Sequence, residues 1–569
     1  MRIGSRYRDS AGVHVDDRLV ADLREVAALM TTMPPQGRSI LLATDSGLVQ
    51  ELTVGDVIRR AAALSPAVTA LVEAIPGGGR SWTYARLLAD AEAVARALLG
   101  RFAPGEKVAV WAPNIPEWIL LQLGAGLAGL TLVTVNPALR NDEARHVLAQ
   151  SGADGLFHVA EYRGFDVGAA VAGLRPALPA LREVIRVEEL AAFAAAGDPT
   201  TELPLVTPDD LVQIQYTSGT TGVPKGATLR HRGIVNNAIL SYTRLLGMRP
   251  GEAMVNPMPL FHTAGSCLAV LSLLWSQGTH VLAPGFDPAW QLELIERHRA
   301  PGFCGVPTML HAMLAQPGLA ERDLSCLRYA LSGGATVDPA LLRRIEQTFG
   351  IRMCIIYAQT EASPGITMTR LDDSPADRAE TLGRPLPAID VKIAAADGTT
   401  PAPLGEVGEL CTRGYHVMAG YHDEPGLTAA AIDDGGWLHT GDLAAMDPRG
   451  YLTIRGRLKE MIIRGGENIY PREIEEVLAR HLAVAQVAVV GVPDEKWGEQ
   501  VAAAVIPAAG ATLTAAELEE YGKAHLAPHK VPRVWAFVDA FPVTGSGKIR
   551  KNVLRDRLVS DRHEPQPPA

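Results

Sequence analysis

The sequence predicts an α/β protein with a large N-terminal domain of layered α/β sheets and a small, mobile C-terminal α+β domain. Short apolar strands alternate with amphipathic helices through the middle of the chain, separated by turns that contain Pro and Gly. This pattern is typical of layered α/β sheets. After about Arg457 the pattern becomes compact, and the 569 residues have room for about three to four units of roughly 150 residues. We therefore expect more than one domain.

The composition excludes several classes of protein. Hydrophobic residues make up 47% of the chain and charged residues 20%, which is ordinary for a globular protein and unlike a disordered or collagenous chain. The formal net charge of -10 argues against a nucleic acid or an anionic membrane as the main partner. The five cysteines are widely spaced and form neither a disulfide framework nor a CxxC zinc site, so a reducing cytoplasm is the expected location.

Residues 1–50 are expected to form an N-terminal extension. It carries an amphipathic patch at Asp16–Met30 and a break at Pro34-Pro35, and it has no apolar core that would serve as a signal peptide. The most membrane-like stretch is Trp118–Val135, but glycines and polar residues interrupt it. A Leu-rich helix followed by a buried strand explains this stretch better than a membrane span does.

Residues 51–457 are expected to form the large domain, with an early helix and strand as its clearest elements. The helix begins after Thr83, a typical N-cap residue, and a strand follows at Lys107–Ala112. One face of the helix is apolar. Its apolar residues are Leu87, Ala91, Val94, Ala95 and Leu98.

Residues 458–558 are expected to form the small domain, followed by a disordered tail at 559–569. Pro471 suits the first turn of a helix, and two apolar strands follow at 484–492 and 500–507. Thr514 and Glu517 then have the spacing of a capping box at the start of another helix.

The segment Tyr216–Ala227, YTSGTTGVPKGA, carries the strongest chemical signal. It leaves an apolar strand, and its hydroxyls, glycines and lysine could surround a polyphosphate, because glycines let backbone N–H groups approach an anion closely. The spacing is not that of a Walker P-loop. We therefore expect ATP to be bound in another way.

This segment resembles the phosphate loop of the adenylate-forming superfamily, which includes acyl-CoA synthetases, carrier-loading adenylation domains and firefly-type luciferases. Further motifs of that superfamily follow in the expected order, so the resemblance runs from about Ser81 to Lys551, and it is closest to freestanding acyl-CoA ligases. The motifs are LSGGA at 331–335, YAQTE at 357–361, GWLHTGD at 436–442, GYLTIRGRLKEMIIRGGENIYPREIE at 450–475 and PVTGSGKIRK at 542–551.

The resemblance implies roles for individual residues in the activation of a carboxylate by ATP. Glu361 corresponds to the Mg²⁺ ligand, which suits the preference of this hard ion for carboxylate oxygens. Thr360 is expected to donate to the α-phosphate, and Lys548 corresponds to the adenylation lysine. Asp442 corresponds to the ribose aspartate, with Arg457 as a second ribose or phosphate contact. The full set expected to bind ATP or AMP is Thr217, Ser218, Gly219, Thr220, Thr221, Gly222, Lys225, Gly333, Gly334, Ala335, Tyr357, Ala358, Gln359, Thr360, Asp442 and Arg457.

The resemblance also implies a second half-reaction with coenzyme A. Lys459 corresponds to the hinge residue on which the small domain turns, so that a reactive intermediate is first shielded from water and then exposed to a thiol. Arg464, Gly465 and Gly466 are candidates for lining the channel of the CoA pantetheine arm.

The segment Pro259–Ser266 resembles the border of the acyl pocket, with His262 as the gate for carboxylate entry. Gly265, Val306 and Ala335 are the other expected pocket residues. Because no arginine is placed for a second carboxylate, we expect a largely apolar monocarboxylic acid, of medium or long chain or bulky and polycyclic. Ala358 stands where many members have glycine, and its methyl group is expected to narrow the pocket beneath Tyr357.

Several alternatives remain open at the level of sequence. The acyl group could be delivered to a separate carrier protein or an amine, since no carrier domain is expected after Lys548. Luciferase-type oxygenation has no sequence mark, and a nucleotide-binding protein without turnover is disfavoured by the joint presence of Lys548, Glu361 and Asp442. Expected partners are therefore the acid, ATP with Mg²⁺, and CoA. Dimers are common in the superfamily, so a homodimer is also considered.

Overall fold

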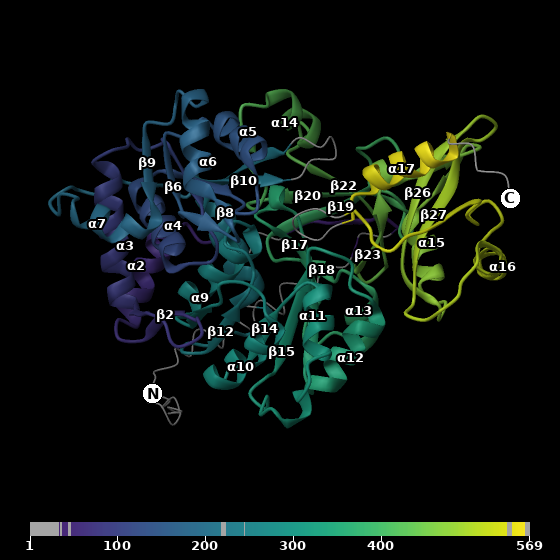
Figure 1. The fold of residues 1–569 in the computed structure, drawn as a ribbon, viewed down its shortest axis with the longest axis horizontal. Helices are drawn as coiled ribbons and strands as arrows, with labels where there is room; N and C mark the ends of the chain where they lie inside the picture. Colours follow the sequence, from purple (N-terminus) through teal and green to yellow (C-terminus); the bar gives the residue numbers. More distant parts are fainter. Residues whose placement is uncertain are drawn as a thin grey trace. The chain divides into compact units, whose positions relative to one another are not determined.

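The computed structural model describes residue 34 and residues 37–43, 47–217, 224–243, 245–542 and 549–563 (Figure 1). The chain divides into two compact units, of which the first comprises Met1–Pro35, Ile40–Val391 and Thr412–Leu438. The second comprises Gln36–Ser39, Lys392–Cys411 and His439–Ala569. The amphipathic patch predicted at Asp16–Met30 lies outside the described residues, as does the end of the predicted tail, 564–569. The boundary predicted after Arg457 falls within the second unit and remains a prediction.

The first unit contains a seven-stranded sheet that is parallel over most of its width. Strands β10, β5, β4, β6 and β9 run parallel, and β11 and β21 join antiparallel at one edge. In spatial order the strands are β21 (Gly420–Tyr421), β11 (Lys225–Arg230), β10 (Leu211–Thr217), β5 (Thr131–Val135), β4 (Lys107–Trp111), β6 (Gly155–His158) and β9 (Glu183–Arg186).

A nine-stranded sheet forms the other large layer of the first unit. Its middle strands are parallel, from β16 through β15, β14, β12 and β13 to β2. In spatial order the strands are β18 (Arg384–Pro385), β17 (Gly365–Met368), β16 (Arg352–Ala358), β15 (Tyr329–Gly333), β14 (Gly302–Cys304), β12 (Ala253–Asn256), β13 (Thr279–Leu282), β2 (Thr69–Glu73) and β3 (Ser81–Thr83).

Helices connect these strands, and the local signals predicted from the sequence are confirmed. Thr83 caps α3 by accepting a hydrogen bond from the Arg86 amide, and the five apolar residues predicted for one face are all buried. Trp118–Val135 comprises the buried residues of nearly all of α4, followed by β5, as predicted. The main helices of this unit are α2 (Val54–Leu64), α3 (Tyr84–Leu99), α4 (Pro116–Ala128), α5 (Asn141–Ser151), α6 (Val167–Leu174), α7 (Leu190–Ala195), α8 (His231–Ala238), α9 (Leu271–Ser276), α10 (Pro288–His298), α11 (Pro307–Leu314), α12 (Pro339–Phe349), α13 (Pro375–Glu380) and α14 (Pro425–Ala431).

The 436–442 motif runs into β22, which is a strand of a five-stranded sheet. Its strands, in spatial order, are β1 (Ile40–Leu41), β19 (Ile389–Ala394), β20 (Gly408–Gly414), β22 (Leu438–Met446) and β23 (Leu452–Arg457). A short helical turn, η7 (Leu458–Glu460), follows β23.

The C-terminal part of the second unit is an α+β fold whose sheet is covered on both faces. Its elements are β24 (Ile462–Arg464), β25 (Glu467–Ile469), α15 (Pro471–Leu478), β26 (Val484–Asp494), β27 (Gly498–Pro507), α16 (Ala515–His525), β28 (Val534–Phe537) and α17 (Lys551–His563). Alternate residues of β26 and β27 face two separate apolar clusters, one with α15 and α16 and the other with α17. Pro471 begins α15, and Thr514 with Glu517 forms the predicted capping box.

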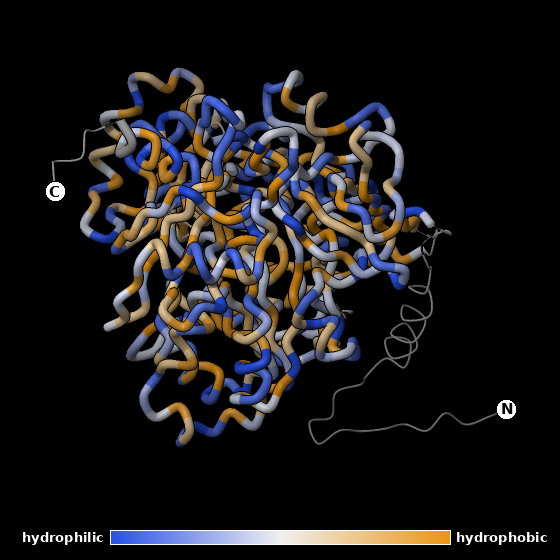
Figure 2. Tube along the Cα trace, turned by 90° about the vertical axis from the view of Figure 1, so that its right-hand side faces the viewer, coloured by the Kyte–Doolittle hydropathy of each residue, from blue (hydrophilic) through white to orange (hydrophobic). Residues whose placement is uncertain are grey.

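Apolar strands account for most of the interior. Along the tube in Figure 2, hydrophobic residues concentrate in inner segments and hydrophilic residues in outer turns. All five residues of β5 are buried, as is typical of a mostly apolar strand inside a parallel sheet. None of the helices in the described ranges is both long and apolar enough to cross a membrane.

Three buried histidines make the first unit sensitive to acid. Burial lowers the pKa of His231 to about 4 and the pKa values of His280 and His416 to about 3, from an ordinary value of 6.5. Nδ1 of His231 accepts a hydrogen bond from the Val54 amide at 3.1 Å, a contact that the neutral ring provides. The folded chain therefore holds these rings neutral in a range where the unfolded chain protonates them.

We expect the free energy of unfolding of the first unit to fall as the pH is lowered from 7 to 5, because stability is lost from pH 6.5 downward toward the folded-state pKa values. The linkage between protonation and folding lowers the free energy of unfolding by about 2 kcal/mol for each histidine at pH 5. Urea unfolding followed by tryptophan fluorescence at both pH values measures the loss. His231→Gln should reduce this pH dependence, whereas His311→Gln, at an exposed position, should not. An unchanged pH dependence in His231→Gln would contradict the assignment.

Candidate active site

The carboxyl ends of four adjacent parallel strands bring predicted site residues to one edge of the nine-stranded sheet. The acyl segment at 259–266 follows β12, Val306 follows β14, and 333–335 ends and follows β15. Tyr357–Glu361 lies at the end of β16 and just beyond it. Parallel strands carry ligand-binding loops at their carboxyl ends, so this edge is the part of the fold where a site is expected.

The segment after β16 is held in a defined turn. Nε2 of Gln359 donates to the Tyr357 hydroxyl at 3.2 Å, and Thr360 and Glu361 lie in a short 3₁₀ turn, η6 (Thr360–Ala362). In the adjacent strand, a Cβ on Gly333 would lie 2.6 Å from the carbonyl oxygen of Ile356, so only glycine fits there. Ala335 is exposed, and Ala358 is partly buried.

The two ends of the predicted phosphate loop lie side by side in the seven-stranded sheet. Thr217, the last residue of β10, is paired with Lys225, the first residue of β11. The antiparallel pairing holds the loop closed at its base. The loop residues Ser218, Gly219, Thr220, Thr221 and Gly222 lie outside the described residues.

Tyr421 joins the base of this loop to the predicted magnesium ligand. Its hydroxyl donates to Oε1 of Glu361 at 2.8 Å, and Nζ of Lys225 lies 5.2 Å from the centre of its ring. Burial, followed by the charge of Glu361, raises the pKa of Tyr421, so this phenol stays protonated and able to donate. The structure thus brings Lys225 and Glu361 together, although they are predicted from separate motifs.

Sequence reasoning missed Tyr421. It lies 60 residues from Glu361 along the chain, and strand β21 places it opposite Ala227 of β11. Lys225 is two residues before Ala227 and therefore on the same face of β11. The available signal was a tyrosine in a glycine- and proline-flanked stretch, GYHDEPG, which has no helical or strand period.

Buried glutamines of β10 hold the acyl segment in place. Gln213 and Gln215 each donate through Nε2 to Oγ of Ser266, at 3.2 and 3.3 Å, and this hydroxyl donates to the carbonyl oxygen of His262 at 3.1 Å. Both glutamines and Ser266 are at most 2% exposed. The strand that leads into the phosphate loop therefore also supports the acyl segment, a connection that sequence reasoning did not find.

The acyl segment itself turns sharply. His262 is exposed, and its Nδ1 accepts a hydrogen bond from the amide of Ala264 at 3.2 Å. A Cβ on Gly265 would lie 2.3 Å from the carbonyl oxygen of Pro259, so glycine is required at the start of the π-helical turn η4 (Ala264–Val270). Val306 is partly buried at the N-terminus of α11.

In the second unit, the two predicted ribose contacts form an ion pair. Asp442 and Arg457 are cross-strand partners in β22 and β23, and Nε of Arg457 lies 3.0 Å from Oδ1 of Asp442. The side chain of Asp442 is 7% exposed and that of Arg457 is 48% exposed. The carboxylate is therefore oriented from one side by the guanidinium before any ligand binds.

The three predicted CoA-binding residues form a tight β-hairpin. Arg464 pairs with Glu467, and the two turn residues between them, Gly465 and Gly466, have φ values of +60° and +86°. Such a turn strongly prefers glycine. The guanidinium of Arg464 lies 5.0 Å from the centre of the Trp497 ring and donates to Gln500.

The structure describes the predicted hinge lysine but not the predicted adenylation lysine. Lys459 is exposed in η7, within the second unit. Lys548 lies outside the described residues. Lys551, three positions after Lys548, forms ion pairs with Glu475 and Glu460 at 2.8 and 3.0 Å, which ties the start of α17 to α15 and η7.

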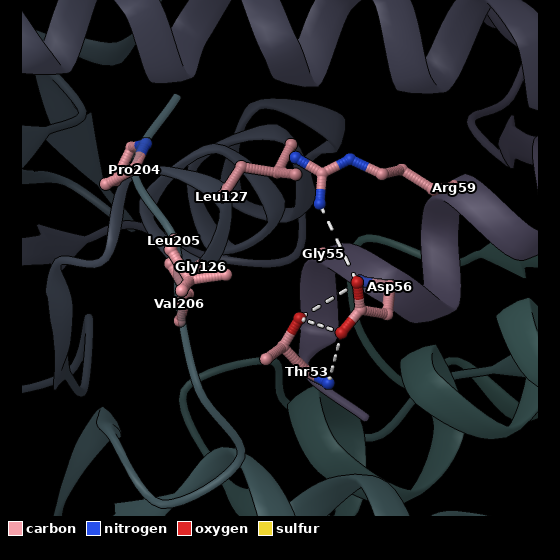
Figure 3. A pocket seen from close by; sticks show the side chains of 9 residues that line it. All are labelled: Thr53, Gly55, Asp56, Arg59, Gly126, Leu127, Pro204, Leu205 and Val206. Atoms are coloured by element: carbon pink, nitrogen blue, oxygen red, sulfur yellow. Dashed lines mark hydrogen bonds and ion pairs between the residues drawn. The ribbon is translucent and has the colours of Figure 1, made fainter. Parts of the chain in front are cut away.

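A small pocket lies elsewhere in the first unit. It is formed at the start of α2, the end of α4 and the segment around Leu205 (Figure 3). In it Arg59 lies 3.8 Å from Asp56, whose carboxylate already caps α2 together with Thr53. None of the predicted site residues that the structure describes lines this pocket, so we do not include it in the candidate site.

Comparison with known proteins identifies the family. The model of the family described as "AMP-binding enzyme" matches residues 58–422, and the one described as "AMP-binding enzyme C-terminal domain" matches residues 473–548. The first match alone covers more than half of the chain. The chain belongs to the AMP-binding enzyme family. The resemblance to the adenylate-forming superfamily is thereby confirmed.

Individual relatives of this AMP-binding enzyme include ligases that form acyl-CoA. A mitochondrial medium-chain acyl-CoA ligase, ACSF2 of Macaca fascicularis, is 35% identical over 567 residues, covering 94% of this chain and 91% of the relative. A feruloyl-CoA synthase from Amycolatopsis sp is 38% identical over 501 residues, covering 88% and 98%. The chain is accordingly an AMP-forming acid–thiol ligase.

A solved structure confirms the predicted fold class of the enzyme. The crystal structure of ATP-bound MatB from Rhodopseudomonas palustris superposes with a TM-score of 0.81 at 28% identity, covering 89% of this chain and 99% of that chain. The predicted architecture, a large N-terminal α/β domain with a small C-terminal domain, is correct.

Proposed function

We propose that this ligase activates a largely apolar monocarboxylic acid, of medium or long chain or bulky and polycyclic, and transfers it to coenzyme A. In the first step a carboxylate oxygen of the acid attacks the α-phosphorus of ATP, and pyrophosphate leaves. In the second step the thiol of CoA, as its proton is removed, attacks the carbonyl carbon of the acyl-adenylate, and AMP leaves. The proposal extends the family assignment to the substrate, the metal and the individual residues.

The cluster of Lys225, Tyr421 and Glu361 is the observation that carries this proposal. A cation at the base of the phosphate loop lies near a carboxylate, and one phenol contacts both. Such an arrangement suits the binding of a triphosphate together with a metal ion, since the ammonium attracts phosphate oxygens and the carboxylate attracts the metal. A site for a neutral ligand would not need either charge.

The residues present fit Mg²⁺ at Glu361. Tyr421 donates to Oε1, and the second carboxylate oxygen can serve as a ligand for a hard cation that also takes phosphate oxygens. Bound there, Mg²⁺ would neutralise charge on the leaving pyrophosphate. We assign the triphosphate to Thr217, the loop residues 218–222 and Lys225, and the α-phosphate to Thr360.

We assign the nucleoside contacts to residues of separate motifs. The flat face of Tyr357, with Ala358, Gln359 and the segment 333–335, would hold the adenine. Asp442 would accept the ribose hydroxyls, and the ion pair with Arg457 supports this role because it fixes the orientation of the carboxylate.

The acyl group is assigned to the segment that the buried glutamines support. His262 would gate entry of the carboxylate, and Gly265, Val306 and Ala335 would line the pocket. These pocket residues are small or apolar and include no arginine, which favours a single carboxylate on an apolar body. The named activities of the medium-chain and feruloyl relatives are consistent with such acids.

We assign to Lys548 the stabilisation of the negative charge in the first step. Its ammonium would stabilise the attacking carboxylate and the α-phosphate. Lys459 would serve as the hinge, and Arg464, Gly465 and Gly466 would line the pantetheine channel. The hairpin of the two glycines is compact enough for close approach of a ligand to its backbone. A cytoplasmic location and a homodimer remain predictions from the sequence.

We expect AMP release to require both an apolar monocarboxylic acid and CoA for sustained turnover. Purified enzyme with ATP and Mg²⁺ would be given hexanoate, octanoate, palmitate, ferulate, a steroid carboxylic acid and malonate, each with and without CoA. AMP and thioester are measured by chromatography. The apolar acids should give equal amounts of AMP and thioester, and malonate should give little of either.

Two results would contradict this proposal. Turnover with malonate above that with every apolar acid would exclude the assigned substrate class. Acid-dependent AMP formation that CoA does not stimulate, but an amine or carrier protein does, would replace CoA as the acceptor.

Tyr421→Phe should weaken the use of magnesium while leaving the ring beside Lys225. The change removes one hydrogen bond to a charged carboxylate, which costs about 1.5 kcal/mol, or about tenfold. We expect the Mg²⁺ concentration for half-maximal acyl-adenylate formation to rise accordingly. Tyr415→Phe is a matched control, because the buried Tyr415 hydroxyl has no hydrogen-bond partner among the residues that the structure describes. Equal Mg²⁺ dependence in the two variants would disprove the role of Tyr421.

A further inference from the structure

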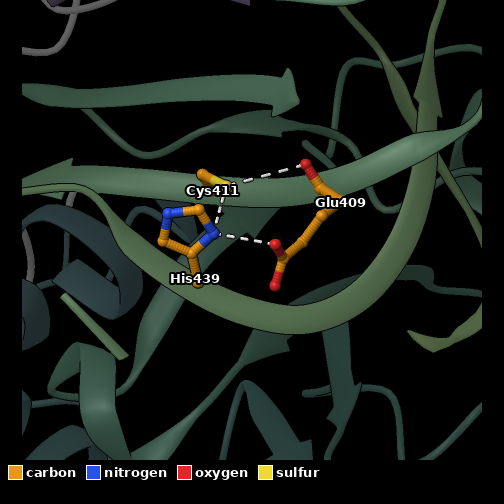
Figure 4. Close-up of side chains that lie close together, drawn as sticks. All are labelled: Glu409, Cys411 and His439. Atoms are coloured by element: carbon orange, nitrogen blue, oxygen red, sulfur yellow. Dashed lines mark hydrogen bonds and ion pairs between the residues drawn. The ribbon is translucent and has the colours of Figure 1, made fainter. Parts of the chain in front are cut away.

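Three side chains of different chemistry converge between two strands of the second unit. Glu409 and Cys411 lie two residues apart on β20, and both therefore point to the same face of the strand. His439 is the second residue of the neighbouring strand β22 and points toward both of them (Figure 4). One ligand-type atom from each lies within 4.8 Å of the other two.

We propose that Glu409, Cys411 and His439 form a binding site for a borderline-soft divalent cation of the zinc class. The site is separate from the magnesium position assigned to Glu361, which belongs to the first unit. It does not depend on which acid the enzyme activates.

The distances fit tetrahedral coordination with little rearrangement. Tetrahedral zinc with Zn–S of about 2.3 Å and Zn–N of about 2.0 Å places sulfur and nitrogen about 3.5 Å apart. Here Sγ of Cys411 lies 3.5 Å from Nδ1 of His439. Oε2 of Glu409 lies 2.8 Å from the same nitrogen, where about 3.3 Å is needed, so the carboxylate has to move by about half an ångström.

The donor set selects the kind of ion. A thiolate, an imidazole and a carboxylate together favour zinc and its neighbours in the transition series over Mg²⁺ and Ca²⁺, which take oxygen ligands. Two of the three donors would be anionic, so a divalent ion would leave this part-buried site without net charge. On binding, the thiol proton would be released and the neutral imidazole would carry its one proton on Nε2, so that Nδ1 is free to coordinate. Water would take the fourth position.

The surroundings hold the donors in position. The amide of Gly441 donates to Oε1 of Glu409 at 2.9 Å, which orients Oε2 toward His439. Cys411 is fully buried, whereas the side chains of Glu409 and His439 are 16% and 22% exposed and leave a route for the ion. Hydrogen bonds from neighbouring groups to the side chains that bind a metal raise metal affinity.

An ion bound at this position would affect the structure around Asp442. His439 lies three residues before Asp442 in β22, and Gly441 between them is bonded to Glu409. A cation bound to β20 and β22 would cross-link the two strands beside Asp442, which lies in β22. It would therefore stiffen the support of the assigned ribose contact.

Cobalt is a suitable probe because its spectrum reports geometry and sulfur ligation. Metal-free full-length enzyme without a histidine tag, reduced with a phosphine, would be titrated with Co²⁺. We expect one equivalent to bind, with the visible bands of a tetrahedral ion and a near-ultraviolet sulfur-to-cobalt charge-transfer band. Zn²⁺ should displace the cobalt and remove both signals.

Cys411→Ser should abolish the charge-transfer band and weaken binding at least about tenfold. Cys354→Ser is the matched control, because Cys354 is also buried but lies in β16 of the first unit; its titration should match the wild type. Thermal unfolding shows whether the variants fold. If Cys411→Ser does not fold, Glu409→Gln serves in its place and should also weaken binding at least about tenfold.

Two outcomes would overturn the site. Wild-type enzyme that retains neither Co²⁺ nor Zn²⁺ after dialysis has a hydrogen-bonded triad and no metal site. A charge-transfer band that persists in Cys411→Ser would mean that the bound sulfur is another cysteine.

Discussion

The hydrogen bond from Tyr421 to Glu361 is the contact on which the arrangement of the site depends most. Tyr421 belongs to the edge of the seven-stranded sheet and Glu361 to the turn after β16 of the nine-stranded sheet. The bond therefore fixes the edge of one sheet against the carboxyl edge of the other. Because Lys225 lies over the same ring, the two opposite charges that we assign to a magnesium–triphosphate complex are held together. A second link of this kind runs from the glutamines of β10 to Ser266, so one strand supports both the predicted phosphate loop and the predicted acyl segment.

Much of the fold could be predicted because its signals are local in the chain. Thr83 and the Thr514–Glu517 pair mark helix starts through side chains within three residues of the amides they cap. The apolar runs of β5, β26 and β27 identify buried strands, and the change of pattern after Arg457 indicates a different sheet. The segments that the motifs single out lie at the ends of β10, β15 and β16, where parallel strands place loops.

The contacts that organise the site could not be predicted in the same way. Tyr421 and Glu361 are 60 positions apart, and Gln213 and Ser266 are 53 apart. Both pairs meet because of strand order, which no periodicity in the sequence encodes. The same holds for Cys411 and His439, whose proximity follows from the pairing of β20 with β22. The cysteines form no CxxC motif, and their spacing could not show a cysteine that meets a histidine from another strand.

The most direct measurement of the central claim is exchange of labelled pyrophosphate into ATP, which reports the first step without CoA. Wild-type enzyme with Mg²⁺ and an apolar monocarboxylic acid should catalyse exchange that disappears when the acid is omitted. Lys548→Ala should lower the rate at least about 100-fold, as expected for loss of a charge that stabilises the transition state. Absence of exchange with every apolar acid, or equal exchange without any acid, would contradict the account.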